Sequence, residues 1–194
     1  MLQKISYAII KRFELFGLVN DENREIYLFG SYQLLMLLIN LISMISIGIL
    51  FHQTAQCLLY MALFIPLRTY AGGYHACSSR KCYVYSTLCI IAAMLIIKLD
   101  FLNFTTCYGV ATICGVIIFR LAPVEDRNKP LDDVEIIHYR VRSQVVLIIE
   151  GMFFIVSLTL KWKTGVICTT LAFLTLCLML VIGIVKNLKL KLKS

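Results

Sequence analysis

Residues 68–82 read RTYAGGYHACSSRKC and form a polar stretch between long apolar runs. The stretch holds two adjacent glycines, a histidine, two cysteines and three basic residues. Because the flanking runs are apolar enough for a lipid bilayer, this stretch separates membrane segments on either side of it. A histidine and a cysteine seven positions apart, at the edge of a membrane, indicate thiol chemistry on a membrane-bound substrate.

The composition around this stretch is typical of an integral membrane protein. Of the 194 residues, 60% are hydrophobic and 15% are charged, whereas a soluble domain carries about 25% charged residues. The net charge of +8 does not indicate nucleic-acid binding, because the basic residues lie between apolar runs and not along one face. We therefore expect an all-α polytopic protein that sits in a lipid membrane and has no nucleic-acid partner, with residues 1–194 forming one domain.

The first 25 residues predict an N-terminal amphipathic helix and a turn. Ile5, Ile9, Phe13 and Phe16 follow helical spacing, with basic residues beside them. This stripe fits either a helix in the membrane interface or an ordinary helix packed on the bundle. Residues 1–20 lack the continuous apolar core of a signal peptide, so we expect the later spans to direct insertion.

Six apolar segments predict about six transmembrane helices. Their approximate ranges are 31–51, 55–67, 83–99, 101–119, 145–160 and 164–185. The second is short for a span of about 20 residues, so it is expected to start earlier, tilt or be partly re-entrant. The separators are short except for residues 68–82 and 120–144.

The distribution of basic residues predicts the orientation. With six spans and the N-terminus inside, all but three of the 19 Lys and Arg residues fall on the cytoplasmic side. The exceptions are Lys98, Lys161 and Lys163. The positive-inside rule favours this arrangement. Both termini, residues 68–82 and the 120–144 loop should therefore face the cytoplasm.

Six of the eight cysteines are interpreted as small apolar side chains, because they lie in or near apolar segments without paired spacing. They are Cys57, Cys89, Cys107, Cys114, Cys168 and Cys177. No C-x-x-C pair occurs, so the sequence supports neither a zinc site nor a redox pair, and we expect no cofactor or metal.

Cys82 is the candidate nucleophile. Ser78 or Ser79 can cap a helix that continues into the third span, and with Ser79 as the cap Cys82 lies in its first turn. The positive end of that helix, together with Arg80 and Lys81, favours the reactive thiolate. The alternative interpretation is one more buried or lipid-facing thiol.

His75 is the candidate general base, which would take the Cys82 proton and later give it to the leaving amine. Gly72 and Gly73 permit the sharp bend that would bring the two together, and Gly73 supports the backbone shape. Cys77, two residues from His75, is the competing nucleophile. Arg68 is a candidate to bind a substrate carboxylate or oxyanion, although anchoring a lipid phosphate suits its charge equally well.

These residues resemble the accessory gene regulator B (AgrB) family, whose members are bacterial membrane cysteine endopeptidases of peptide quorum sensing. The shared pattern is Arg68, Gly73, His75 with Ala76, and Cys82. A second similar stretch, APVEDRNKP, covers residues 122–130. The extra Cys77 is a departure that leaves open which thiol acts.

The resemblance implies a thiol protease with a substrate of the AgrD precursor type. Cys82 would attack the peptide bond after the signal sequence, release the C-terminal tail and hold the remainder as a thioester. An internal cysteine of the substrate would then close a thiolactone ring, or an internal serine a lactone. The basic residues of the 120–144 loop would meet an acidic tail, although a solvated loop explains them as well.

Two other function classes stay open at this point. Glu150 is an ionisable group inside a predicted span, and such groups often belong to transport pathways, so a small transporter or exporter is one alternative. A non-catalytic membrane scaffold is the other. Neither would depend on the Cys82 thiol, which separates both from a peptidase. A homodimer also stays open.

Overall fold

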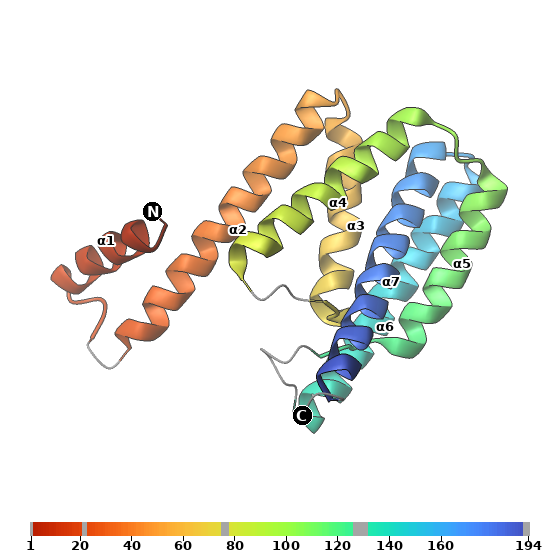
Figure 1. Ribbon diagram of the computed structural model, residues 1–194. Coiled ribbons are helices and arrows are strands. Elements are labelled where there is room, and N and C mark those ends of the chain that lie inside the picture. Colours follow the sequence, from red (N-terminus) through yellow and green to blue (C-terminus); the bar gives the residue numbers. More distant parts are fainter. Residues whose placement is uncertain (1, 21–22, 75–77, 126–131, 192–194) are drawn as a thin grey trace. The chain divides into compact units, whose positions relative to one another are not determined.

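The computed structural model describes residues 2–20, 23–74, 78–125 and 132–191, and every regular element within these ranges is a helix. The elements are α1 (Leu2–Leu15), α2 (Arg24–Leu50), α3 (Thr54–Ala71), α4 (Ser79–Leu99), α5 (Phe104–Leu121), α6 (Asp133–Thr159) and α7 (Lys163–Lys191). The chain is an all-α polytopic membrane protein, as its composition predicted (Figure 1).

Each of the six predicted apolar segments forms a helix. In the described part of the chain, five of these helices are long and apolar enough to cross a membrane, namely α2, α4, α5, α6 and α7. Helix α3 is not among them although it is as long as α5, because Arg68 and several other polar side chains make it less apolar. It faces protein along much of its length, and its buried residues include Tyr60 and Leu67.

Helix α6 corrects the predicted 120–144 loop. Arg120 belongs to the last turn of α5, and α6 already begins at Asp133. The Asp132 side chain accepts a hydrogen bond from the Asp133 backbone N–H (2.8 Å), and the Glu135 side chain accepts one from the Asp132 N–H (3.3 Å). This capping box starts the helix well before the apolar run.

The chain divides into two compact units, Met1–Ser46 and Ile47–Ser194. In the first unit, the Ser6 hydroxyl of α1 donates to the Leu28 carbonyl of α2 (3.1 Å) and contacts the Ser31 hydroxyl. Phe13 of α1 and Phe16, which follows the helix, remain exposed. An exposed apolar stripe beside basic residues favours the interfacial interpretation of this helix.

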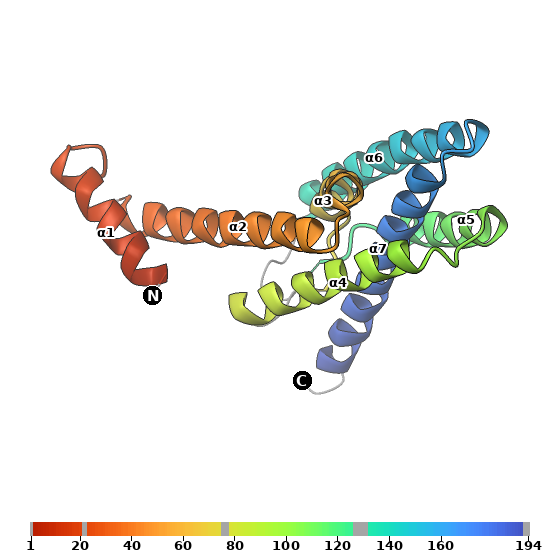
Figure 2. The same ribbon diagram turned by 90° about the horizontal axis from the view of Figure 1, so that it is seen from above.

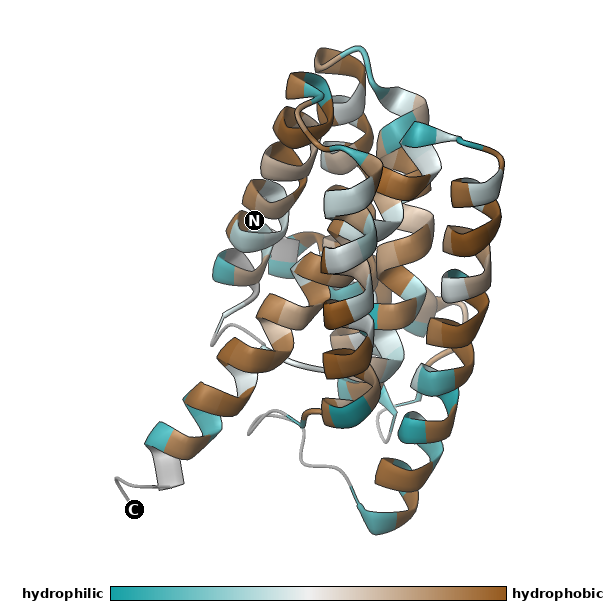
Figure 3. Ribbon diagram, turned by 90° about the vertical axis from the view of Figure 1, so that its right-hand side faces the viewer, coloured by the Kyte–Doolittle hydropathy of each residue, from teal (hydrophilic) through white to brown (hydrophobic). Residues whose placement is uncertain are grey.

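Helix α7 is the core of the second unit. It contacts α3, α4, α5 and α6, which lie around it in both views (Figures 1 and 2). Residues 165–173 of α7 are buried. The outer faces of the other helices instead expose apolar side chains such as Leu88, Val116 and Ile148. In water such exposed apolar faces would favour aggregation. Figure 3 shows hydrophobic residues along most of each helix and hydrophilic residues mainly near the helix ends.

The cysteines follow the prediction closely. Five of the six that were interpreted as apolar side chains are buried in the second unit, and Cys89 on α4 is half-buried.

Candidate active site

Arg68 controls how the chain leaves α3. It lies in the last turn of the helix, and its guanidinium donates to the Gly72 carbonyl and, over 2.7 Å, to the Tyr74 carbonyl. A planar guanidinium offers donors in a fixed fork, so one side chain can hold two backbone carbonyls at once. The structure therefore places Arg68 against the backbone that leads to His75.

Gly72 and Gly73 take backbone angles that other residues rarely adopt. Their φ angles are +68° and +107°. A Cβ atom on Gly72 would overlap the Val124 carbonyl, and one on Gly73 would lie 3.2 Å from the backbone of Met179. Both positions thus require glycine for backbone shape and for close approach.

Hydrogen bonds hold residues 72–74 from two sides. The Gly73 N–H donates to the Val124 carbonyl (2.8 Å), while the Val124 N–H donates to the Ala71 carbonyl (3.0 Å). On the other side, the Tyr74 N–H donates to the Met179 carbonyl of α7 (3.0 Å). Residues 72–74, which we name the anchored segment, are therefore fixed between the α5–α6 connection and α7.

Gly183 makes the contact with α7 possible. A Cβ atom there would lie 2.9 Å from the Tyr74 nitrogen and 3.1 Å from the Gly73 carbonyl carbon. One turn further on, the Asn187 side chain donates to the Glu125 carbonyl (2.8 Å). Val124, which belongs to the 122–130 stretch, thus contacts residues 71–73 through backbone hydrogen bonds. Helix α7 contacts both stretches, through Met179 on one side and Asn187 on the other.

Cys82 lies at the beginning of α4, and its thiol is exposed. Ser78 is the N-cap residue, and its hydroxyl accepts a hydrogen bond from the Lys81 N–H over 3.4 Å. The Cys82 N–H donates to the Ser78 carbonyl (3.0 Å). With Ser78 as the cap, Cys82 is one position further along the helix than the Ser79 alternative would place it.

His75, Ala76 and Cys77 lie outside the described residues, so the structure gives no His75–Cys82 distance. The residues on either side of them are placed. The Tyr74 ring packs edge-on against the Tyr85 ring of α4, with 6.0 Å between centroids. Tyr85 is three positions, about one helical turn, after Cys82. The anchored segment therefore ends close to the first turns of α4.

Basic groups surround this end of the second unit. The Lys186 ammonium lies 5.1 Å from the centre of the Tyr74 ring, and the Arg142 guanidinium lies 5.6 Å from that of Tyr70. Cation–π contacts of this kind hold the cations near the anchored segment. Arg142 was predicted in a loop and instead projects from α6.

Glu150 does not belong to this site. It lies far along α6, is 5% exposed, and its Oε2 atom has no hydrogen-bond partner among the described residues.

Sequence reasoning proposed Arg68, Gly73, His75 and Cys82 and singled out the 122–130 stretch that contains Val124, but it did not point to Met179 or Gly183. Met179 contributes a backbone carbonyl and Gly183 the absence of a side chain, and neither leaves a signal in residue type. Only Gly183, a glycine inside a helical apolar run, carried a hint of close backbone approach.

Comparisons with known proteins find relatives of this chain. The family model for accessory gene regulator B matches residues 2–186. Two proteins of Clostridium perfringens, one from strain 13 and one from strain SM101, carry AgrB-like names and are each 30% identical over 138 residues. The match covers 68% of this chain and 64% of each relative, so it spans somewhat less than two thirds of their length. No solved structure matches the chain.

Proposed function

The chain belongs to the accessory gene regulator B family, and from this membership we propose that it is a membrane-embedded cysteine endopeptidase. Its substrate is a precursor peptide of the AgrD type, and its product is a cyclic quorum-sensing peptide. The observation that carries the proposal is the pairing of an exposed Cys82 thiol at the start of α4 with an anchored segment that ends one residue before His75.

The first step is acyl transfer to Cys82. The Cys82 thiolate attacks the carbonyl carbon of the scissile bond, after His75 has taken the thiol proton. The carbon–nitrogen bond then breaks, and His75 returns the proton to the leaving amine. The C-terminal tail departs with a free amino group, while the signal and leader portions remain as a thioester on Cys82.

The second step closes the ring without water. A cysteine thiol within the bound peptide attacks the thioester carbonyl, its sulfur forms the new thioester bond, and the Cys82 sulfur leaves. His75 carries the proton from the attacking thiol to Cys82. Water must be kept away, because hydrolysis would give a linear acid. A serine in the same position of the substrate would give a lactone.

Arg68 and Gly73 act as positioning residues in this account. Arg68 holds the carbonyls of Gly72 and Tyr74, and the Gly73 N–H holds the Val124 carbonyl. Together they fix the backbone from which His75 extends. The predicted contact of Arg68 with a substrate carboxylate would compete with these backbone hydrogen bonds.

The same proposal includes the membrane orientation. Both termini and the active site face the cytoplasm, where a newly made precursor is available. The basic residues at this end of the bundle, including Lys186 and Arg142, favour that side.

A membrane transporter is the second candidate, and Glu150 is the observation that favours it. A buried carboxylic acid inside a candidate span, without a hydrogen-bond partner for Oε2 in the described structure, is typical of ion and proton pathways. Such a protein would not need the Cys82 thiol.

The test is release of the C-terminal tail from a candidate precursor peptide by the purified protein in lipid nanodiscs, followed by mass spectrometry. We expect the wild type to release the tail, and Cys82→Ser and His75→Ala to abolish release. Cys114→Ala, which changes a buried thiol of α5, serves as the matched control and should remain active. Release that survives in Cys82→Ser would refute Cys82 as the nucleophile, and Cys77→Ala would then test the competing thiol. Absence of release by the wild type would refute the peptidase assignment.

A further inference from the structure

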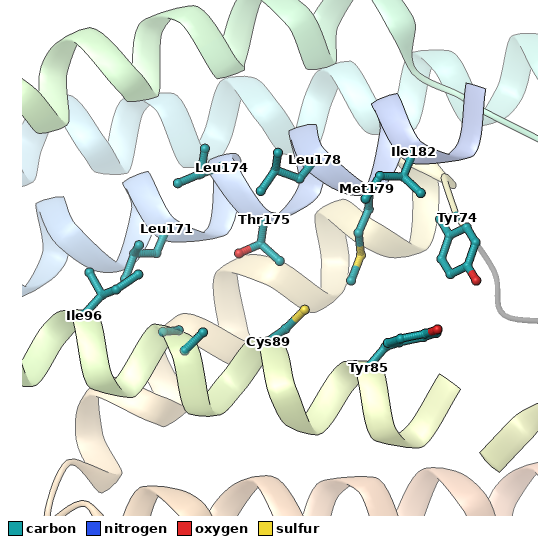
Figure 4. A pocket seen from close by; sticks show the side chains of 12 residues that line it. Tyr74, Tyr85, Cys89, Ile96, Leu171, Leu174, Thr175, Leu178, Met179 and Ile182 are labelled. Atoms are coloured by element: carbon teal, nitrogen blue, oxygen red, sulfur yellow. The ribbon is translucent and has the colours of Figure 1, made fainter. Parts of the chain in front are cut away.

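A groove of about 510 Å³ runs between α4 and α7. Tyr85, Cys89 and Ile96 line it from α4, and Leu171, Leu178 and Ile182 line it from α7 (Figure 4). Its volume falls within the range of pockets that hold small-molecule ligands, about 300–1,000 Å³. We refer to it as the α4–α7 groove.

One end of the groove coincides with the candidate active site. Tyr74, the last residue of the anchored segment, and Tyr85 lie together at this end, while Ile96 and Leu171 lie at the other (Figure 4). The lining residues Tyr85, Cys89 and Ile96 are three, seven and fourteen positions after Cys82. At about 100° per residue, these spacings put Cys82 on the same face of α4 as the groove.

The groove is built to hold hydrocarbon. None of the described residues that line it is charged. The Thr175 hydroxyl is held by the buried Tyr60, whose hydroxyl donates to it over 3.1 Å. Charged groups lie at the active-site end, where the Lys186 ammonium lies against the Tyr74 ring and Arg68 donates to the Tyr74 carbonyl. A ligand that fits this pattern is apolar along the groove and polar at its active-site end.

We propose that the α4–α7 groove binds apolar side chains of the precursor peptide on the acyl side of the scissile bond. This rests on the proposed function, because the acyl portion is the part that remains attached to Cys82. A groove that continues the Cys82 face of α4 holds that portion, whereas the released tail must reach water. Occupation of the groove also keeps water from the thioester until the second thiol attacks.

Ala92→Phe tests the proposal, since Ala92 lines the groove and a phenyl ring there would fill part of it. Ala62→Phe, an exposed position on α3 outside the groove, is the matched control. Tail release would be measured for two peptides, one with leucine residues just before the scissile bond and one with alanine there. Ala92→Phe should lower kcat/KM for the leucine peptide by about tenfold or more, a size expected for a change in an apolar pocket, and should affect the alanine peptide much less.

A cross-linking experiment covers the case in which Ala92→Phe does not fold. The Cys82→Ala protein would be mixed with a peptide that carries a photoreactive leucine analogue just before the scissile bond. Mass spectrometry should locate the cross-links on residues toward the active-site end of the groove, such as Tyr85, Cys89 and Ile182. Cross-links confined to α5 or α6 would overturn the proposal. In a second labelling experiment with a photoreactive phospholipid, labelling of the groove that the peptide does not reduce would also overturn it.

The two claims fail in distinguishable ways. If the wild type releases no tail from either peptide, the peptidase function fails. If the wild type releases the tail but Ala92→Phe and Ala62→Phe have the same kcat/KM for each of the two peptides, the peptidase function stands and the groove assignment is wrong.

Discussion

Gly183 shows how the absence of a side chain lets the anchored segment pack against α7. The anchored segment crosses α7 at this residue, and the atoms that a Cβ would meet are backbone atoms of Gly73 and Tyr74. Backbone atoms held by hydrogen bonds on two sides cannot move aside as a flexible side chain would.

Gly183→Ala should therefore displace the anchored segment. We expect tail release to fall by about tenfold or more, the cost that small misplacements of catalytic groups carry, together with a lower melting temperature. Gly109→Ala on α5 is the control, because a Cβ there meets nothing within 4 Å. That change should preserve activity and favour the helix by up to about 1 kcal/mol. Wild-type activity and stability in Gly183→Ala would contradict the described packing.

Arg68 offers a second test at this scale, because its two carbonyl contacts need a forked donor. Arg68→Lys keeps the charge and loses the fork, so at least one carbonyl loses its partner. Hydrogen bonds to charged groups contribute about 1.5–3 kcal/mol each, and partial exposure of Arg68 places this site near the lower value. We expect a lower melting temperature and a lower kcat with little change in KM.

A control substitution and a comparison of two peptide types complete the test of Arg68. Arg12→Lys, an exposed position on α1, should change neither quantity. If Arg68→Lys instead raises KM only for peptides with a free C-terminal carboxylate, and not for amidated ones, then Arg68 binds substrate and is not a positioning residue.

At the scale of single helices, α6 illustrates what the sequence offered and what was missed. Residues 133–144 were assigned to a loop because they are polar, yet a helix that extends beyond the bilayer needs no apolar face there. The order Asp132, Asp133, Glu135 carries the capping-box pattern, so the true start of α6 was present in the sequence. The start of α6 is missed when the helix is placed from its apolar residues alone.

Asp132→Ala should destabilise the start of α6 by about 1 kcal/mol, the usual cost of an N-cap. Hydrogen exchange of the first-turn amides of α6 in nanodiscs reports this directly, and exchange should become faster there than in the wild type. Asp133→Ala removes a first-turn carboxylate without removing the cap, and its effect should be smaller. Equal effects of the two substitutions would argue against the capping box.

The contacts that hold the anchored segment beside α3 could not be predicted from the sequence. The apolar runs located all six helices of the predicted bundle, and the polar pattern singled out Arg68, Gly73 and Cys82 as candidates. The contacts of Val124 and Met179 with residues 71–74 join three segments distant in sequence. Such contacts follow from tertiary packing, which no local pattern encodes. The same is true of the α4–α7 groove, which needs two helices side by side.

For the whole molecule, charge and hydropathy make a joint prediction about orientation. In this prediction α2, α4, α5, α6 and α7 cross the membrane, and α3 crosses it as well, because both termini lie on one side only with an even number of crossings. The basic residues choose the side. The bridge between Gly72 and Val124 and the hydrogen bond from Asn187 to Glu125 bring the ends of α3, α5 and α7 to one side of the second unit. That side also carries most of the basic residues of this unit.

A reporter that fluoresces only in the cytoplasm tests the orientation. Fused after the C-terminal residue it should fluoresce, and inserted after Trp162, in the α6–α7 connection, it should not. A reporter that is active only outside the cytoplasm should give the inverse result at the two positions. The opposite pattern for both reporters would place the candidate active site on the outer face and remove its access to a newly made precursor.

The central claim is that Cys82 carries an acyl group during catalysis, and intact-protein mass spectrometry tests it most directly. Wild-type protein mixed with precursor peptide in nanodiscs and quenched in acid should gain the mass of the peptide without its tail. Hydroxylamine, which cleaves thioesters, should remove that mass, and peptide mapping should place it on Cys82. An adduct that persists in Cys82→Ala, or that maps to Cys77, would contradict the account.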